Sequence, residues 1–370
     1  MHELTMPSFG ADMDDGVLVE WHVQPGRAVQ RGEVVAVVET QKGAIDVEAW
    51  QPGTIARLIA EPGQRLTVGK PLALLAGDGE DWKAVAASAP NAAAVPAPPA
   101  APAVRASPAA RKRAGELGID LAKVAAAAPG EPISIADVER AAQAVPQASA
   151  EDGMRAAIAA AMTHSKREIP HYYLGCEVEV ETAHRWLAQF NEPLPISGRV
   201  LFAALALRLV ALALRETPQL NGQFVDGRFK PATATHLGVV TSLRRGGLVV
   251  PTVHDADRLT LPALMAALRK SIERARSGRL RSSDLADSTV TVSNLGDLGV
   301  ETVYGVIYPP QVALIGLGRV AQRPVVRDGA VVVARTMNVT LAADHRASDG
   351  LVGARFLARL RELMQHPEQP

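Results

Sequence analysis

The chain has 370 residues, 39 basic and 39 acidic side chains, a formal net charge of zero and one cysteine, Cys176. The balanced charge gives no field that would attract nucleic acid or a membrane surface, and a single cysteine excludes a disulfide framework. The length suffices for two or three domains of ~100 to 200 residues each; the lone thiol and a start, "MHELTMPSFG", that lacks a secretory signal indicate a cytoplasmic protein.

Residues 1–78 contain an internal repeat with an offset of 37 residues. The turn residues coincide at this offset: Gly16 with Gly53, Pro25-Gly26 with Pro62-Gly63, and Gly32 with Gly69. Apolar residues also coincide, such as Leu18 with Ile55 and Val29 with Leu66. Short apolar runs between glycine turns are typical of strands, so the repeat predicts two β-layers related by a pseudo-two-fold axis.

The stretch "VETQKGAIDVE", residues 38–48, joins the two halves and places Lys42 at the tip of a hairpin. Most lysines in turns are only solvated charge. A lysine that protrudes from a small rigid domain is also suited to carry a covalently attached group. The residues alone leave both interpretations open.

Residues 79–105 form an Ala/Pro-rich linker, because "AVAASAPNAAAVPAPPAAPAV" (84–104) has no charge or aromatic side chain and repeated proline. We expect no regular helix there, but an extended tether of ~3.1 Å per residue. A small helical module follows at 106–141, with Ser107 as N-cap before Pro108 and a capping box from Ser134 to Asp137. Its first helix carries the basic run Arg111, Lys112 and Arg113. A second linker is expected at 142–152.

Residues 153–370 have the mixed pattern of an α/β domain. We expect helices at about 153–168, 181–190, 197–216, 260–277 and 350–364, and strands within 169–181, 236–243, 247–253, 288–296, 311–320 and 335–344. The run "LFAALALRLVALAL" (201–214) is too short to span a membrane and contains Arg208, which favours a buried core helix. The "GLG" at 316–318 lacks the third glycine and following helix of a phosphate loop.

The motif "DHRASDG" (344–350) lies where a strand ends and a helix begins. Asp344, Arg346 and Asp349 could fix the orientation and tautomer of His345, as a general base requires. Most of the nine histidines, including His171 and His254, are expected to be ordinary surface or core residues. Asp349 could equally be a helix cap. Cys176 is expected to be a small half-buried side chain rather than a nucleophile.

The modules and motifs together resemble the dihydrolipoamide acyltransferase component of 2-oxo acid dehydrogenase complexes. Residues 1–78, with their opening "MPSFGADMDDGVLVEW", resemble a lipoyl domain. Biotinyl domains share that fold, but their lysine typically lies between methionines, whereas Lys42 lies between Gln41 and Gly43. Residues 106–141 resemble the peripheral-subunit-binding domain. "DHRASDG" matches the His-x-x-x-Asp-Gly motif that the family shares with chloramphenicol acetyltransferases.

The resemblance implies a multidomain fold. Its parts are an all-β lipoyl domain built as a flattened barrel of two β-layers, a small helical domain, and a chloramphenicol acetyltransferase-like α/β catalytic domain with a mixed sheet. It implies lipoate on Lys42, coenzyme A as cosubstrate and no metal. His345 would be the general base, Ser293 in "TVSNLG" would donate to the oxyanion, and Asp349 would orient the histidine.

The implied partners are a 2-oxo acid decarboxylase/dehydrogenase and dihydrolipoamide dehydrogenase. The implied assembly is a homo-oligomer of trimers, in cages of about 24 chains or more, with the active site between subunits. Acetyl transfer in a pyruvate dehydrogenase complex is the first expectation. The alternatives are branched-chain acyl transfer and a noncatalytic, lipoyl-bearing tethering scaffold. A mere carrier domain would leave "DHRASDG" unexplained, and an antibiotic-modifying acetyltransferase would need neither Lys42 nor the linkers.

Overall fold

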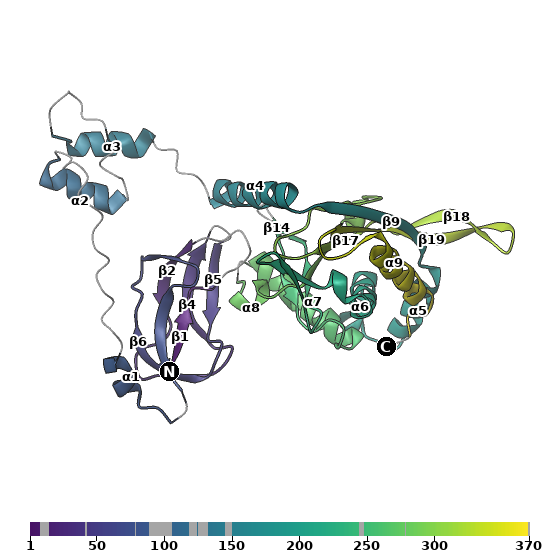
Figure 1. Ribbon diagram of the computed structural model, residues 1–370, viewed down its shortest axis with the longest axis horizontal. Helices are drawn as coiled ribbons and strands as arrows, with labels where there is room; N and C mark the ends of the chain where they lie inside the picture. Colours follow the sequence, from purple (N-terminus) through teal and green to yellow (C-terminus); the bar gives the residue numbers. More distant parts are fainter. Residues whose placement is uncertain are drawn as a thin grey trace. The chain divides into compact units, whose positions relative to one another are not determined.

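The computed structural model spans the chain and describes residues 1–7, 15–40, 43–77, 79–88, 106–117, 124, 132–144, 150–243, 248–277 and 279–368. The chain divides into two compact units, Met1–Ala87 with Ala150–Pro370, and Ser88–Ser149. Figure 1 labels the helices and strands that make up the modules.

The N-terminal module consists of two four-stranded sheets, in the orders β1-β8-β6-β3 and β5-β4-β2-β7. The strands are β1 His2–Thr5, β2 Asp15–Trp21, β3 Ala28–Val29, β4 Val34–Thr40, β5 Gly43–Glu48, β6 Gly53–Leu58, β7 Arg65–Thr67 and β8 Pro71–Ala76. Strands β2, β3 and β4 of the first repeat correspond to β6, β7 and β8 of the second. The two sheets therefore have equivalent orders, which confirms the predicted pair of β-layers.

The repeat is also present in the hydrogen bonds of the turns. The amide of Gly26 donates to the carbonyl of Ile55 at 2.7 Å, and the amide of Gly63 donates to the carbonyl of Leu18 at 2.7 Å. Both glycines have positive φ, +90° and +85°, a conformation that favours glycine over residues with a Cβ atom. Leu18 and Ile55 are fully buried between the layers. The matching glycines in the sequence thus correspond to matching turns.

The predicted linker begins later than expected, because Trp82–Ser88 forms helix α1. This contradicts the expectation that residues from 84 onward form no regular helix. The segment precedes the first proline of the linker and contains three alanines and one lysine, which favour helix. The Trp82 ring also packs over Gly26, where a Cβ atom would lie 3.1 Å from the ring. Residues 89–105 lie outside the described residues.

The small helical module has the two helices predicted, α2 Pro108–Leu117 and α3 Ile135–Ala144. Ser107 Oγ accepts a hydrogen bond from the amide of Ala110 at 3.1 Å. Ser134 and Asp137 form the reciprocal capping box, with N···O distances of 3.0 and 3.3 Å. A small apolar core holds the helices together, made by Ala110, Ala114, Val124, Ile133 and Val138. Both predicted helix starts are confirmed.

The second linker is shorter than the expected 142–152, since α3 continues to Ala144 and helix α4, Ala150–Glu168, begins before residue 153. Ala142, Gln143 and Ala144 at one edge and Ala150 and Glu151 at the other favour helix and extend the two elements into the predicted linker. Residues 145–149 lie outside the described part of the chain.

The C-terminal module is built on a seven-stranded mixed sheet in the order β15-β12-β16-β17-β19-β18, with β9 also paired to β19. Strands β12, β16 and β17 run parallel, and the other pairs are antiparallel. The strands are β9 His171–Glu179, β12 Leu237–Val239, β15 Thr252–Val253, β16 Val290–Asn294, β17 Ala313–Leu317, β18 Ala321–Arg327 and β19 Ala330–Asp344. The predicted α/β class with a mixed sheet is confirmed.

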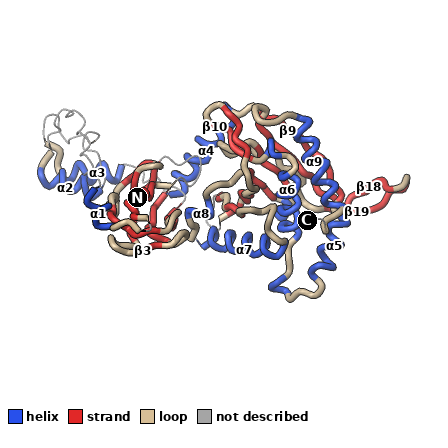
Figure 2. The backbone as a smooth tube through the Cα atoms, turned by 60° about the horizontal axis from the view of Figure 1, so that its bottom comes forward, coloured by secondary structure: helices blue, strands red, loops and turns tan. Residues whose placement is uncertain are grey.

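Helices cover the sheet, as Figure 2 shows for α6 and α9. The remaining elements are α5 Glu181–Asn191, η2 Ile196–Gly198, α6 Phe202–Arg215, η3 Pro218–Leu220, β13 Thr241–Ser242, β14 Leu248–Val249, α7 Leu261–Ser277, α8 Ser282–Leu285, η4 Gly296–Leu298 and α9 Gly350–Gln365. The segment Ile196–Arg215 is long and apolar enough to cross a membrane, but 56% of its most apolar 18-residue window is buried inside the structure. Helix α6 is therefore the core helix that the sequence predicted.

Two hairpins were not predicted, although each contains a recognisable turn. Strands β10 (Gly222–Val225) and β11 (Arg228–Pro231) meet at Asp226-Gly227, and β18 meets β19 at Asp328-Gly329. All four turn residues have positive φ. An Asp-Gly pair between apolar strands is a strong hairpin signal, so both hairpins could have been found from the sequence.

The Gly-Leu-Gly at 316–318 serves close packing. A Cβ atom at Gly316 would collide with the carbonyl of Val303, and one at Gly318 would collide with the carbonyl of Glu301. The segment that follows η4 therefore lies directly on strand β17. The absence of side chains at these two positions is what allows the approach.

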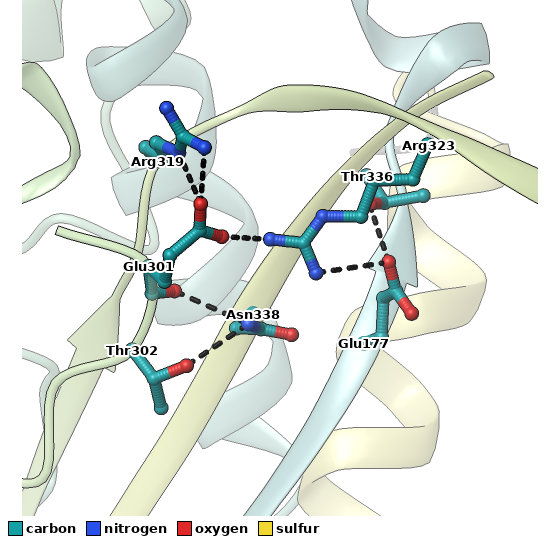
Figure 3. Close-up of polar contacts among 7 residues, drawn as sticks. All are labelled: Glu177, Glu301, Thr302, Arg319, Arg323, Thr336 and Asn338. Atoms are coloured by element: carbon teal, nitrogen blue, oxygen red, sulfur yellow. Dashed lines mark hydrogen bonds and ion pairs between the residues drawn. The ribbon is translucent and has the colours of Figure 1, made fainter. Parts of the chain in front are cut away.

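A polar network holds the same segment in place (Figure 3). The Glu301 carboxylate accepts hydrogen bonds from Arg319 and Arg323, and Arg323 also pairs with Glu177 on β9 at 3.3 Å. The Asn338 side chain donates to the Glu301 carbonyl at 3.2 Å and to Thr302 Oγ1 at 2.9 Å. The segment is thus tied to β9, β18 and β19.

We expect Gly318→Ala to lower the free energy of unfolding by about 1 to 3 kcal/mol, because its methyl group has no room beside the Glu301 backbone. Thermal unfolding of the full chain measures the change. Gly350→Ala is the matched control, since nothing lies within 4 Å of a Cβ atom there. Equal stability of the two variants would contradict the packing role of Gly318.

Candidate functional site

His345 lies on a rigid turn between β19 and α9. Its amide donates to the carbonyl of Pro170 at 3.0 Å, and the amides of Ala347 and Ser348 donate to the Asp344 carbonyl at 3.0 and 3.1 Å. The side chain of His345 is exposed. Its ring makes an edge contact with Tyr172, with centroids 5.3 Å apart and planes at 67°. The backbone is thus fixed while the imidazole faces outward.

Asp344 and Arg346 pair with each other and not with the imidazole. The Asp344 carboxylate is fully buried and accepts hydrogen bonds from Arg346 Nε at 3.0 and 3.1 Å and from Nη2 at 2.7 Å. The Arg346 guanidinium also lies 4.0 Å from the centroid of the Phe224 ring. A buried carboxylate requires such a partner. The expectation that Asp344 or Arg346 orients the His345 ring is therefore wrong.

Asp349 occupies the N-cap position of α9. Its Oδ1 accepts hydrogen bonds from the amides of Leu351 and Val352, both at 3.0 Å. This is the helix-cap alternative considered from the sequence, and it holds the turn that carries His345. A direct role of Asp349 in orienting the ring stays a prediction.

Ser293 lies at the end of β16, half-buried, and is paired with Gly316 on β17. Gly316 in turn is paired with Thr340 on β19. His345 lies five residues beyond Thr340, so the two candidates lie about 17 Å apart along the strands and about 10 Å apart across them. Because β19 runs antiparallel to β16 and β17, Ser293 and His345 lie at opposite ends of the sheet. One chain does not bring them together, so a site that uses both takes each from a different chain.

A cavity of about 330 Å³ adjoins Asn294, the residue after Ser293. Its wall includes Phe202 and His184, whose rings stack with centroids 4.1 Å apart. His184 Nε2 is buried without a hydrogen-bond partner in the described part of the chain, and burial lowers the pKa of this histidine. The sequence pattern does not indicate this cavity, because its lining comes from helices and strands that are distant in sequence.

His171, His254 and Cys176 are held in the fold by hydrogen bonds or by packing. His171 Nε2 accepts from the amide of Ile307 at 3.2 Å, so its proton is on Nδ1, which contacts the Ile169 carbonyl at 2.8 Å. His254 is half-buried beside His236. Burial lowers the pKa of both His171 and His254, which favours the neutral form of each ring. Cys176 lies half-buried on β9 and packs against the core.

Lys42 and Gln41 lie outside the described residues. The flanking strands β4 and β5 pair up to Thr40 and Gly43, so the described hairpin continues to the residues on either side of them. This geometry fits a group attached at the end of the hairpin. For metals, the described side chains contain no group of three or more His, Cys, Asp or Glu residues that could hold an ion.

The chain thus combines a two-layered β module, a two-helix module, and an α/β module with an exposed histidine after its longest strand. The family model "2-oxoacid dehydrogenases acyltransferase (catalytic domain)" matches residues 145–370, more than half of the chain. The chain belongs to this family, as predicted from the sequence. The models "Biotin-requiring enzyme" and "e3 binding domain" match residues 2–75 and 98–139.

Relatives that match nearly the whole chain include components of two kinds of complex. The chain is 31% identical to the dihydrolipoyllysine-residue acetyltransferase component of the pyruvate dehydrogenase complex of Rhizobium meliloti, over 98% of each chain. It is 32% identical to the lipoamide acyltransferase component of the branched-chain alpha-keto acid dehydrogenase complex of Pseudomonas aeruginosa, over 99% of this chain and 98% of that one.

The solved structures that resemble the C-terminal module include the following two. A probable dihydrolipoamide acetyltransferase of Listeria monocytogenes has a TM-score of 0.55 and 28% identity, covering 58% of this chain and 92% of that one. A truncated catalytic core of the 2-oxoacid dehydrogenase multienzyme complex of Thermoplasma acidophilum has a TM-score of 0.53 and 27% identity, covering 59% and 97%.

Proposed function

We propose that this acyltransferase moves an acyl group from a dihydrolipoyl group on Lys42 to coenzyme A within a 2-oxo acid dehydrogenase complex. The observation that carries the proposal is the exposed imidazole of His345 on a turn whose backbone and neighbouring charges are all engaged elsewhere. Lipoate in amide linkage on Lys42 would supply the thiol that carries the acyl group.

His345 would act as general base. A free thiol has a pKa near 8.5 and is mostly protonated at neutral pH, so the coenzyme A thiol needs a base before it can attack. His345 takes that proton, and the coenzyme A thiolate attacks the acyl carbonyl of the dihydrolipoyl thioester. Ser293 of a neighbouring chain donates a hydrogen bond to the carbonyl oxygen as negative charge develops there. The bond from the acyl carbon to the dihydrolipoyl sulfur then breaks, and His345 returns the proton to that sulfur. Asp349 keeps the start of α9, and with it the turn, in position.

Two observations support a site that is shared between two copies of the chain. Ser293 and His345 belong to opposite ends of one sheet, so they can meet only between chains. The β18–β19 hairpin, which extends from the sheet in Figure 1, exposes Val326, Val331 and Val333 by 77%, 72% and 71%. An apolar hairpin of this kind is suited to burial against another chain. Trimers, assembled into larger cages, are the proposed state.

The two-helix module would bind a peripheral enzyme of the complex, dihydrolipoamide dehydrogenase first and the 2-oxo acid decarboxylase as the other candidate. Its match to the "e3 binding domain" model supports this. So does the basic run on α2. We place the protein in the cytoplasm, because its single cysteine suits a reducing compartment.

Acetyl is the proposed acyl group, and branched-chain acyl groups are the alternative. Relatives of both kinds match at nearly equal identity. The purified protein, assayed with acetyl, isobutyryl and succinyl dihydrolipoamide and coenzyme A, decides between them by kcat/KM.

Lys42 should carry lipoate in protein made with lipoate available, because it lies between the strands of the exposed hairpin. Intact-mass and peptide mass spectrometry measure the modification. Lys42→Arg should abolish flux through the whole complex and spare transfer to free dihydrolipoamide. An unmodified Lys42, or biotin in place of lipoate, would rule out the proposed carrier.

His345→Ala should lower kcat by ~10² to 10⁴-fold, since general-base catalysis contributes that much, and should leave the oligomer intact. Ser293→Ala should cost ~10²-fold in kcat with little change in KM, because its hydrogen bond strengthens in the transition state. Asp349→Asn should be milder, since asparagine is also a good N-cap. His254→Ala is the control. Transfer at the parent rate by an assembled His345→Ala protein would favour the tethering scaffold.

The site between chains predicts complementation. When His345→Ala and Ser293→Ala chains are co-expressed, random mixing leaves both residues intact at about a quarter of the interfaces. Mixed oligomers, isolated with two affinity tags, should therefore regain transfer that neither variant has alone. Mixed oligomers as inactive as the single variants would show that both residues act within one chain.

A further inference from the structure

Tyr172 contacts the proposed base directly. Its ring lies edge-on to that of His345, with centroids 5.3 Å apart. Among the described residues, Tyr172 is the one aromatic residue whose ring contacts that of His345. Asp344, Arg346 and Asp349 all have other partners. An exposed imidazole with two free side-chain torsions can occupy several rotamers, whereas proton abstraction requires one.

The position of Tyr172 is itself fixed from three directions. Its backbone pairs with Ala343 on β19, two residues before His345. Its hydroxyl is 2.9 Å from Ser348 Oγ in the turn. Its ring lies under α9 at Gly353, where a Cβ atom would be 3.2 Å from Tyr172 Cε2. The ring is half-buried and packs against the main core.

The backbone connection completes the unit. The carbonyl of Pro170, two residues before Tyr172, accepts the amide hydrogen bond of His345 at 3.0 Å. The start of β9 therefore holds both the main chain of the base and one side of its ring. Burial raises the pKa of Tyr172, so its hydroxyl stays protonated and the residue adds no charge beside the imidazole.

We infer that Tyr172 is a positioning residue, whose aromatic ring restricts His345 to the rotamer used for proton abstraction. The inference rests on the proposed function, and it assigns the role to the ring and not to the hydroxyl. Loss of the ring leaves the base present but poorly oriented, which affects the chemical step more than substrate binding.

The test uses the full-length protein with acetyl coenzyme A and free dihydrolipoamide. Tyr172→Leu should lower kcat by about 10- to 100-fold and change both KM values less than about threefold. Tyr172→Phe, which keeps the ring, should retain kcat within about threefold. Tyr173→Leu is the matched control, because Tyr173 is the next residue on β9 and its ring contacts Tyr304 and His171 instead. Sedimentation and thermal unfolding check assembly.

A second variant tests the same contact if Tyr172→Leu does not fold. Gly353→Ala keeps Tyr172 but pushes against its ring and against Leu174, which lies 2.7 Å from the added Cβ atom. Alanine also favours the helix, so α9 should persist. The expected result is a kcat lowered by about three- to tenfold at unchanged KM.

The outcomes separate this inference from the proposed function. A parent protein that transfers no acyl group, or a fully active His345→Ala protein, refutes the proposed function. The proposed function holds where the parent protein is active and the His345→Ala protein is inactive. If Tyr172→Leu then has the parent kcat, only the role of Tyr172 is overturned. A Tyr172→Phe protein as slow as Tyr172→Leu, or an equal loss in Tyr173→Leu, overturns it as well.

Discussion

Strand direction is the constraint on which the catalytic arrangement depends. Strands β16 and β17 are parallel, and β19 returns antiparallel beside them. The end of β16 that carries Ser293 is therefore at the opposite edge of the sheet from the end of β19 that carries His345. No side-chain rotation can join them, because the distance is set by hydrogen-bonded backbone. The activity proposed for this chain consequently requires a second copy, and the oligomer is part of the site.

The turn between β19 and α9 shows how a reactive side chain is kept free. Asp344 is buried and neutralised by Arg346, which in turn lies over Phe224. Asp349 caps the helix. Each polar neighbour of His345 thus satisfies a structural requirement that burial or a helix start imposes. The imidazole is left facing outward, with Tyr172 at its edge.

Glycines serve packing at several points where backbone must approach backbone. Gly316 and Gly318 admit the segment after η4 onto β17, and the Glu301 network then ties that segment to three strands. In the N-terminal module, paired glycine turns keep the two β-layers equivalent. In both modules, a hydrogen-bonded strand leads to the proposed functional residue, β4 to Lys42 and β19 to His345.

The sequence by itself determined the modules, their fold classes, both helix starts in the small module and the family. These depend on local signals, namely a repeat of turn residues, capping residues and apolar periodicity, which act over a few positions. Two Asp-Gly hairpins carried such a signal and were overlooked. Helix α1 lies at the edge of a segment whose composition otherwise disfavours helix, because its alanines and lysine precede the first proline.

Only the tertiary structure decided how the site is assembled. Pairing of Asp344 with Arg346, contact of Tyr172 with His345 and separation of Ser293 from His345 all join residues whose proximity depends on strand order and direction. A motif shows which chemical groups are present, and it does not show whether a carboxylate turns inward to a buried partner or outward to a histidine. That choice follows from burial, which makes an unpaired charge too costly inside the protein, and burial is a property of the folded chain.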